Sequence, residues 1–200
     1  MTKLPSLLVL SLSLFGCGTA DLEPGHTVSA LTAEHSLVPA VAKLGSPVKG
    51  GQDLKVIHGY NDPLPGETCT IGSSSDHCGN QQFGLDLQPS NKADKTILSP
   101  AAGQVLWTSP DCLGIGTAAS LNLTVCHFQS FEVAKGDWVA VGTLLGMRST
   151  SWIHLSLDNR KGAKKVPVPF TLDYTLAGKS FPDLGAGARD QYKGEVIHIL

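Results

Sequence analysis

AKGDWVAVGTLLGMRSTSWIHLSL, residues 134–157, is the stretch of sequence that decides the fold. Lys135-Gly136-Asp137 is a turn signal between two extended segments, and Gly142 and Gly146 interrupt the apolar residues after it. From Trp152 to Leu157 apolar and polar residues alternate, as they do in a strand with one buried face. The stretch therefore predicts two strands followed by a third.

The alternation places the side chains of this third strand on two opposite faces. His154 and Ser156 share one face, whereas Ile153, Leu155 and Leu157 share the other, which is apolar and is expected to face the core. A histidine held opposite the core is well placed for chemistry. His154 is therefore a candidate functional residue.

Short strand-like runs between glycine, proline and Asn-Asp signals recur through the rest of the chain. They cover residues 55–58, 82–87, 96–98, 103–107, 121–128, 138–141, 152–157, 168–172 and 195–199. Strands at this spacing predict an all-β sandwich or barrel. The last two runs are expected to be edge strands joined by a Gly-rich loop at residues 185–187. The strand residues Trp107, Trp138 and Trp152 are expected in the core or at its edge rather than on a sugar-binding surface.

The N-terminal residues have the pattern of an export signal. Lys3 precedes an apolar run from Leu7 to Phe15, and Cys17 follows. The pattern resembles a bacterial lipoprotein signal, in which cleavage before the cysteine leaves a lipidated Cys17 at the new N-terminus. An ordinary signal peptide and a short membrane anchor are the alternatives, although the run is short for a membrane span. Gly18 after the cysteine favours an outer-membrane or surface location.

These features divide the chain into three parts. Residues 1–16 are the predicted signal peptide, and residues 17–50 are a predicted tether with one short helix at residues 38–44. Residues 51–200 have the size of one globular domain with its own core. Only 16% of the residues are charged and the net charge is −2, so the chain has no basic surface for nucleic acid.

Four cysteines remain when Cys17 is set aside, and an even number in an exported protein implies two disulfides. Four cysteines allow three pairings. We expect Cys69–Cys78 and Cys112–Cys126, because each bridge would close a local loop flanked by turn residues. A structural zinc site and free buried thiols are the alternatives. No C-x-x-C pair is present, so the zinc alternative is weak.

Five short motifs in a fixed order resemble the lysostaphin/LytM-type zinc metallopeptidases, over about residues 52–160. The motifs are QFGLD at 82–86, SPAAGQV at 99–105, VCHF at 125–128, VAKGDWV at 133–139 and IHLSL at 153–157. The order of the motifs carries the resemblance, since no single motif is specific. It implies a LytM-like β-sandwich/barrel hybrid with an open groove and, in active members, an endopeptidase that cuts peptidoglycan peptides.

In that family the zinc ligands are the first His of H-x-x-x-D, its Asp, and the last His of H-x-H. Two further histidines position the water and stabilise the oxyanion. Carried over by position, Asp86 matches the ligand Asp, and His127 and His154 match the two catalytic, non-ligand histidines. Gln82 and Ser156 stand at the other two ligand positions in the groove. A carboxamide and a hydroxyl are poor zinc ligands.

His77 is a replacement for one of the missing ligands. It lies nine residues before Asp86, and a loop closed by a Cys69–Cys78 bridge would fold it back toward the groove. Ser156 has no obvious substitute. The site is therefore one ligand short, unless one of the other two histidines changes its role.

The sequence supports two hypotheses about function. The first is a lipid-anchored, catalytically degraded LytM-like domain that binds peptidoglycan, another glycan or an envelope protein through the old groove, without a cofactor. The second is a working zinc endopeptidase with the irregular ligand set His77, Asp86 and His154. Ser156 favours the first, because it removes a ligand that the mechanism needs. Purely structural roles are the alternatives for Asp86 and His127, and an unrelated carbohydrate-binding sandwich would explain the strands but not the ordered motifs.

Overall fold

The computed structural model describes residues 43–63, 69, 77–79, 82–117, 121–161, 164–171, 173–185 and 188–200. All of them belong to one compact unit, Leu37–Leu200. The predictions for the signal peptide, for Cys17 and for a helix that begins at Val38 concern residues outside this description. Within the described part, no helix has the length and apolar character needed to cross a membrane.

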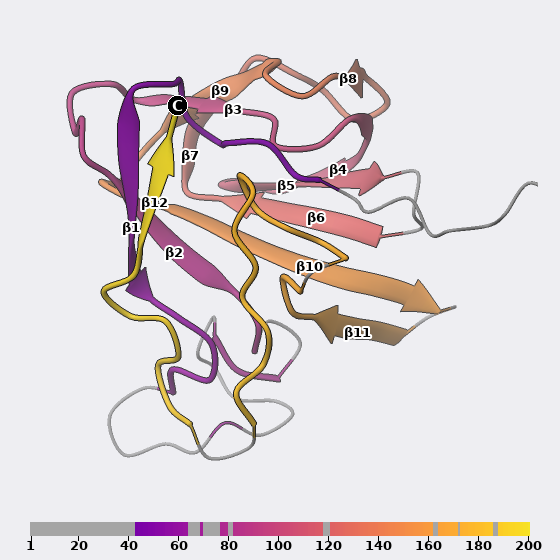
Figure 1. The fold of residues 1–200 in the computed structure, drawn as a ribbon. Helices are drawn as coiled ribbons and strands as arrows, with labels where there is room; N and C mark the ends of the chain where they lie inside the picture. The colour runs from indigo at the N-terminus through magenta and orange to yellow at the C-terminus, as the bar shows by residue number, and fades with distance from the viewer. Residues whose placement is uncertain are drawn as a thin grey trace, which may run out of the picture. The chain divides into compact units, whose positions relative to one another are not determined.

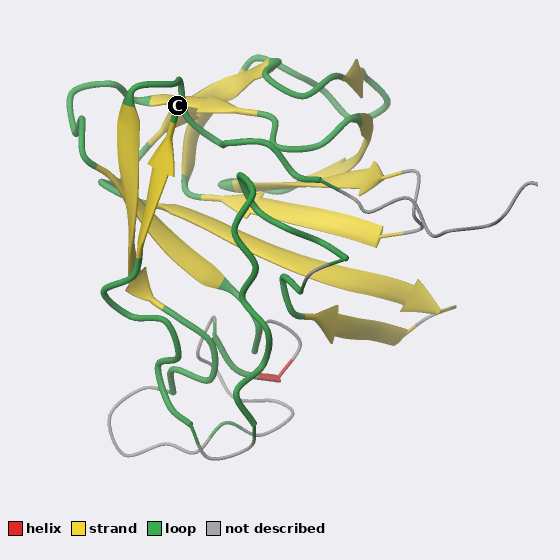
Figure 2. Ribbon diagram, in the orientation of Figure 1, coloured by secondary structure: helices red, strands yellow, loops and turns green. Residues whose placement is uncertain are grey.

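The described chain is built from antiparallel strands in two sheets (Figures 1 and 2). The larger sheet contains, in spatial order, β12 (Val196–Ile199), β1 (Gln52–His58), β2 (Leu85–Pro89), β10 (Ile153–Lys161), β6 (Leu121–Cys126), β5 (Cys112–Thr117), β4 (Gly103–Thr108) and β8 (Trp138–Val139), with β11 (Lys164–Val168) paired to β10. The smaller sheet contains β3 (Thr96–Leu98), β9 (Leu144–Arg148) and β7 (Phe128–Phe131). Neither sheet closes into a barrel, and the predicted all-β class is confirmed.

The centre of the larger sheet has one apolar and one polar face, as the alternation in β10 predicts. Ile153, Leu155 and Leu157 are fully buried in the hydrophobic core. His154 and Ser156 lie on the opposite face, and they are also buried, with 2% and 6% of their surface exposed. Polar side chains therefore lie covered on the second face of this sheet.

Two strands that contain glycine could not be recognised from the sequence. Strands β5 and β9 were not predicted, because glycine ordinarily weakens a strand. A Cβ at Gly114 of β5 would lie 2.2 Å from Trp107 Nε1, and one at Gly146 of β9 would lie 2.0 Å from the Ser130 carbonyl oxygen. Glycine is used at these positions because neighbouring groups approach the backbone closely.

Three other predictions need correction. The strand expected at residues 168–172 is wrong, since β11 spans Lys164–Val168 and the chain leaves the sheet at its prolines. The run 121–128 is two strands, because His127 adopts a positive φ of 76° between β6 and β7. Trp138 is 75% exposed on the edge strand β8, so its predicted place in the core is wrong.

The core extends into both flanking segments. Leu44 and Val48, which the sequence placed in the tether, are buried in the core. In the C-terminal segment Phe170, Leu176 and Phe181 are fully buried in the same cluster. The C-terminal residues also supply the edge strand β12, as predicted.

Candidate metal centre

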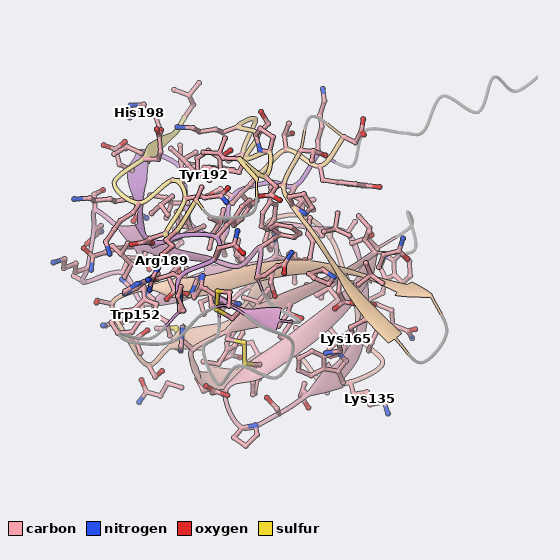
Figure 3. All side chains as sticks on the ribbon, turned by 90° about the horizontal axis from the view of Figure 1, so that it is seen from below. Lys135, Trp152, Lys165, Arg189, Tyr192 and His198 are labelled. Atoms are coloured by element: carbon pink, nitrogen blue, oxygen red, sulfur yellow. A yellow bond between two sulfur atoms is a disulfide. The ribbon has the colours of Figure 1, made fainter. Side chains whose placement is uncertain are left out.

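Both predicted disulfides are confirmed (yellow bonds in Figure 3). Cys112 and Cys126 are direct cross-strand partners in β5 and β6, which brings their Cα atoms to 4.0 Å. Cys69 and Cys78 close a loop across nine residues of sequence, ahead of β2. Each bridge has a site histidine as its neighbour in sequence, because His77 precedes Cys78 and His127 follows Cys126.

Asp86 and His154 meet on the polar face of the larger sheet. Asp86 lies in β2 directly opposite His154 in β10, in an antiparallel register. Because directly opposed side chains share a face, the two groups touch. His154 donates from Nδ1 to Asp86 Oδ1 over 2.9 Å.

His77 reaches the same carboxylate from the disulfide-closed loop rather than from a strand. Its Nδ1 donates to the carbonyl oxygen of Gly84 over 2.9 Å, which fixes the orientation of the ring. Its Nε2 lies 3.3 Å from Asp86 Oδ1. The rings of His77 and His154 stand edge to face, with centroids 5.1 Å apart. We call His77, Asp86 and His154 the Asp86 cluster.

The electrostatics of the Asp86 cluster favour a cation. Burial alone would raise the pKa of the Asp86 carboxyl, but the hydrogen bonds and charges of His154 and His77 outweigh burial and hold that pKa well below its usual range. Burial also lowers the pKa of His77, and the bond to Asp86 more than compensates, so this pKa is raised. The cluster therefore attracts positive charge, which a divalent metal ion would supply.

The donors of the cluster fit a zinc ion. Two imidazoles and one carboxylate each offer a ligand atom, these atoms lie within 4.8 Å of one another, and all three residues are buried. Zinc binds this combination of nitrogen and oxygen ligands in proteins. Among the described residues, His154 Nε2 has no hydrogen-bond partner although it is buried. A buried polar atom without a partner is costly, which indicates a missing ligand.

The other predicted site residues lie around this cluster rather than in it. His127 is half-buried, with its ring centroid 6.4 Å from that of His154 and 5.6 Å from that of Trp152, which Figure 3 labels. Ser156 lies two residues beyond His154 on the same face, opposite Thr124. Gln82 lies in the turn before β2, half-buried.

A second group of potential ligands lies nearby but is a poor metal site. His58, Asp62 and Asp190 also bring ligand atoms within 4.8 Å of one another, and they are more exposed. His58 already pairs with Asp62 at 2.7 Å, and Lys193 pairs with Asp190. A lysine ammonium thus already balances one carboxylate of this group.

Sequence reasoning missed the partners that the sheet register supplies. The contact of Trp152 with His127 depends on the bend of the chain between β6 and β7, which no local pattern records. Asn122 and Asp158, a buried polar pair in β6 and β10, were not predicted as site residues. The alternation of β10 was the signal that could have placed Asp158 on the face of His154.

Comparison with solved structures identifies the fold. The M23 metalloprotease pseudoalterin from the deep sea matches with a TM-score of 0.51 and 13% identity, over 74% of this chain and 84% of that chain. Lysostaphin matches with a TM-score of 0.45 and 14% identity, over 67% of this chain and 58% of that chain. A chain of the SpoIIIAH and SpoIIQ complex matches with a TM-score of 0.45 and 16% identity, over 62% of this chain and 96% of that chain.

Sequence comparison adds nothing to this, since no family model and no curated protein matches the chain. The match to pseudoalterin shows that the described domain has the fold of an M23, LytM-like metallopeptidase. At 13% identity it shows the fold alone.

Proposed function

We propose that this domain holds a zinc ion through His77, Asp86 and His154 and hydrolyses peptide bonds in cell-envelope peptides, with peptidoglycan as the substrate class. The observation that carries the proposal is the set of three buried donors within 4.8 Å of one another. The shared fold with an M23 metalloprotease supports it. Of the two hypotheses drawn from the sequence, the geometry favours the second, in which His154 is a ligand.

The residues of the cluster have separate roles in this proposal. When bound, a zinc ion would polarise water and the substrate carbonyl as a Lewis acid. Gly84 holds the His77 ring through its carbonyl, so that Nε2 faces Asp86. Asp86 supplies the negative charge that balances a cation, and its low pKa keeps the carboxylate ionised at neutral pH.

His127 is the group proposed to move protons. It lies beside the cluster, and its backbone is fixed because the His127 carbonyl accepts from both Ser149 N and Ser149 Oγ. An imidazole there can take a proton from an attacking water and give it to the leaving amine. The indole of Trp152 packs edge to face on the His127 ring and limits its rotation.

The proposed location is the surface of a bacterial envelope, through lipidation at Cys17. The signal-like pattern of residues 1–16 supports this. Cys17→Ser should move the protein from the membrane fraction to the soluble fraction without unfolding the domain. A Cys17→Ser protein that stays with the membranes would contradict the lipid anchor.

The metal content of the purified protein tests the proposed function. We expect about one zinc per chain after exposure to zinc and dialysis, with cleavage of purified peptidoglycan that stops on chelation. His154→Ala should lose both the zinc and the activity. Ser156→Ala is the matched control, because Ser156 lies on the same strand face outside the cluster, and it should keep both. A folded protein that takes up no zinc would overturn the proposal.

A catalytically degraded domain that binds a glycan or an envelope protein is the second candidate function. Trp152 favours it, because the ring that contacts His127, with centroids 5.6 Å apart, is an indole, which cannot exchange protons. On this alternative, zinc uptake can persist without hydrolysis. Stoichiometric zinc together with intact peptidoglycan after long incubation would support it.

A further inference from the structure

A row of buried polar side chains continues from the Asp86 cluster along the same face of the sheet. Ser156 and Asp158 follow His154 in β10, and they pair directly with Thr124 and Asn122 of β6. All four are buried, with 5% or 6% of their surface exposed. We call Asn122, Thr124, Ser156 and Asp158 the polar strip.

The polar strip ends in a carboxylate that no described residue neutralises. Asp158 Oδ1 accepts one hydrogen bond, from Asn122 Nδ2 over 2.8 Å. Among the residues whose side chains the structure describes, none forms an ion pair with Asp158, which is 5% exposed. A buried carboxylate is ordinarily balanced by a cation, because an amide cannot supply the missing charge. The strip therefore has a place for a positively charged group.

Two features bound the strip on the side of β5. Gly114 lies directly opposite Thr124, and a Cβ there would lie 2.2 Å from Trp107 Nε1, so the indole covers this glycine on the face of the strip. The Nζ of Lys165, labelled in Figure 3, lies 5.6 Å from the centroid of the Trp107 ring. The ammonium of Lys165 is thus directed at an aromatic ring instead of Asp158.

The distance along β10 from His154 to Asp158 matches the length of a short extended peptide. A strand rises about 3.3 Å per residue, so the four steps from His154 to Asp158 span about 13 Å, the length of roughly four extended residues. We infer that Asp158, with Asn122, is a subsite for the ammonium group of an extended peptide whose scissile bond lies at the Asp86 cluster. This inference rests on the proposed function for the scissile bond. The ammonium binding itself depends only on Asp158 and Asn122.

The carboxylate would accept a charge-assisted hydrogen bond from the ammonium. A neutral acetylated amine at the same position keeps the peptide shape but leaves Asp158 without a counter-ion. The subsite is therefore expected to discriminate between free and acetylated amines. Chain length should matter as well, because a peptide too short to span from the cluster to Asp158 cannot use both.

The experiment compares penta-alanine, which has four residues before its last peptide bond, with N-acetyl-penta-alanine, using the purified protein loaded with zinc. Binding is followed by NMR titration, and hydrolysis of each peptide is followed in parallel. We expect the free amine to bind at least about tenfold more tightly, and Asp158→Asn to abolish this preference while zinc content and thermal midpoint stay unchanged. Ser156→Ala is the control that should keep the preference. Dialanine and its acetylated form should show a smaller difference.

The outcomes separate this inference from the proposed function. A preference for the free amine without any hydrolysis supports the subsite and counts against the peptidase. Hydrolysis of both peptides at equal rates and equal affinities overturns the subsite and leaves the peptidase standing. If Asp158→Asn does not fold, the wild-type comparison of free and acetylated peptides still decides, since equal binding contradicts the inference.

Discussion

The Asp86 cluster and the surroundings of Arg148 are both buried and polar. Only at Arg148 does every side-chain nitrogen have a hydrogen-bond partner among the described residues. Arg148, at the end of β9, is fully buried and donates five hydrogen bonds, all to backbone carbonyl oxygens. They belong to Asn91, Lys92, Asp94 and Thr150. In the Asp86 cluster, by contrast, His154 Nε2 has no partner among the described residues.

The difference separates a structural polar group from a functional one. Burial lowers the pKa of Arg148, and the hydrogen bonds of its guanidinium tie the loop at residues 91–94 to the smaller sheet. A fully satisfied network of this kind rigidifies a fold. The Asp86 cluster concentrates charge and leaves His154 Nε2 without a partner among the described residues, which is the arrangement of a site that awaits a ligand. Substitutions in the two regions should therefore have different effects, on stability in one and on metal binding in the other.

Arg148→Met should cause the largest loss of stability. It leaves the carbonyls around the 91–94 loop buried without a donor, so we expect the free energy of unfolding in urea to fall by roughly 3 to 5 kcal/mol. Zinc bound per folded molecule should not change. Arg148→Lys keeps the charge but loses the planar guanidinium. Its free energy of unfolding should lie between those of Arg148→Met and the wild type. A loss below about 1 kcal/mol for Arg148→Met would show that the network is dispensable.

Removing either disulfide should cost on the order of 2 to 4 kcal/mol. The two bridges should differ in their effect on the metal. The Cys69→Ser and Cys78→Ser double variant frees the segment that carries His77, so its zinc affinity should fall. The Cys112→Ser and Cys126→Ser double variant leaves all three ligands on their own supports and is the matched control. Equal zinc affinities in the two folded variants would contradict the role given to the Cys69–Cys78 loop.

Zinc itself should stabilise the wild-type protein. At a free concentration 100 times the dissociation constant, a ligand of the folded state adds about 2.7 kcal/mol. Thermal unfolding with and without zinc measures the gain, which His154→Ala should abolish and Arg148→Lys should preserve. A gain that survives His154→Ala would place the metal elsewhere in the protein.

The smallest expected effect is on the pH dependence of the metal-free protein. Because the pKa of Asp86 is lowered on folding, its stabilising contribution is present above about pH 4 and is lost as the pH falls toward the folded value. Because the pKa of His77 is raised, its contribution is present below about pH 6.5 and is lost as the pH rises through the folded value.

The cluster should therefore stabilise the metal-free protein most between about pH 4 and pH 6.5. Urea midpoints measured across this range for the wild type and for Asp86→Asn should differ most there. A constant difference from acid to neutral pH would refute the coupling between the two groups. Added zinc should move the optimum to higher pH, because the metal displaces the proton of His77.

The sequence predicted much of the fold because strand alternation is a local property. The two faces of β10 and both disulfide pairings followed from patterns within a few residues. Strands β5 and β9 were missed, because the close approach of Trp107 to Gly114 and of Ser130 to Gly146 is a contact between strands. No composition rule can report such a contact.

The candidate site could be predicted in its members but not in its geometry. Motif alignment gave His154 a non-ligand role, and His77, Asp86 and His154 were then named together as the irregular ligand set of the second hypothesis. The register of β2 against β10 puts His154 directly opposite Asp86, and this register is set by long-range pairing. The proposal that His154 is a ligand depends on that single alignment of strands.

The bond between Cys69 and Cys78 determines when the metal site can form. His77 is joined to Cys78 in sequence, and the sulfur of Cys69 lies 3.6 Å from the His77 carbonyl oxygen. In a reducing cytoplasm both cysteines would remain thiols, and no covalent bond would close the loop that carries His77. Under the proposed function, a newly made chain is a dormant precursor, and oxidation after export completes its metal centre where its substrate is found.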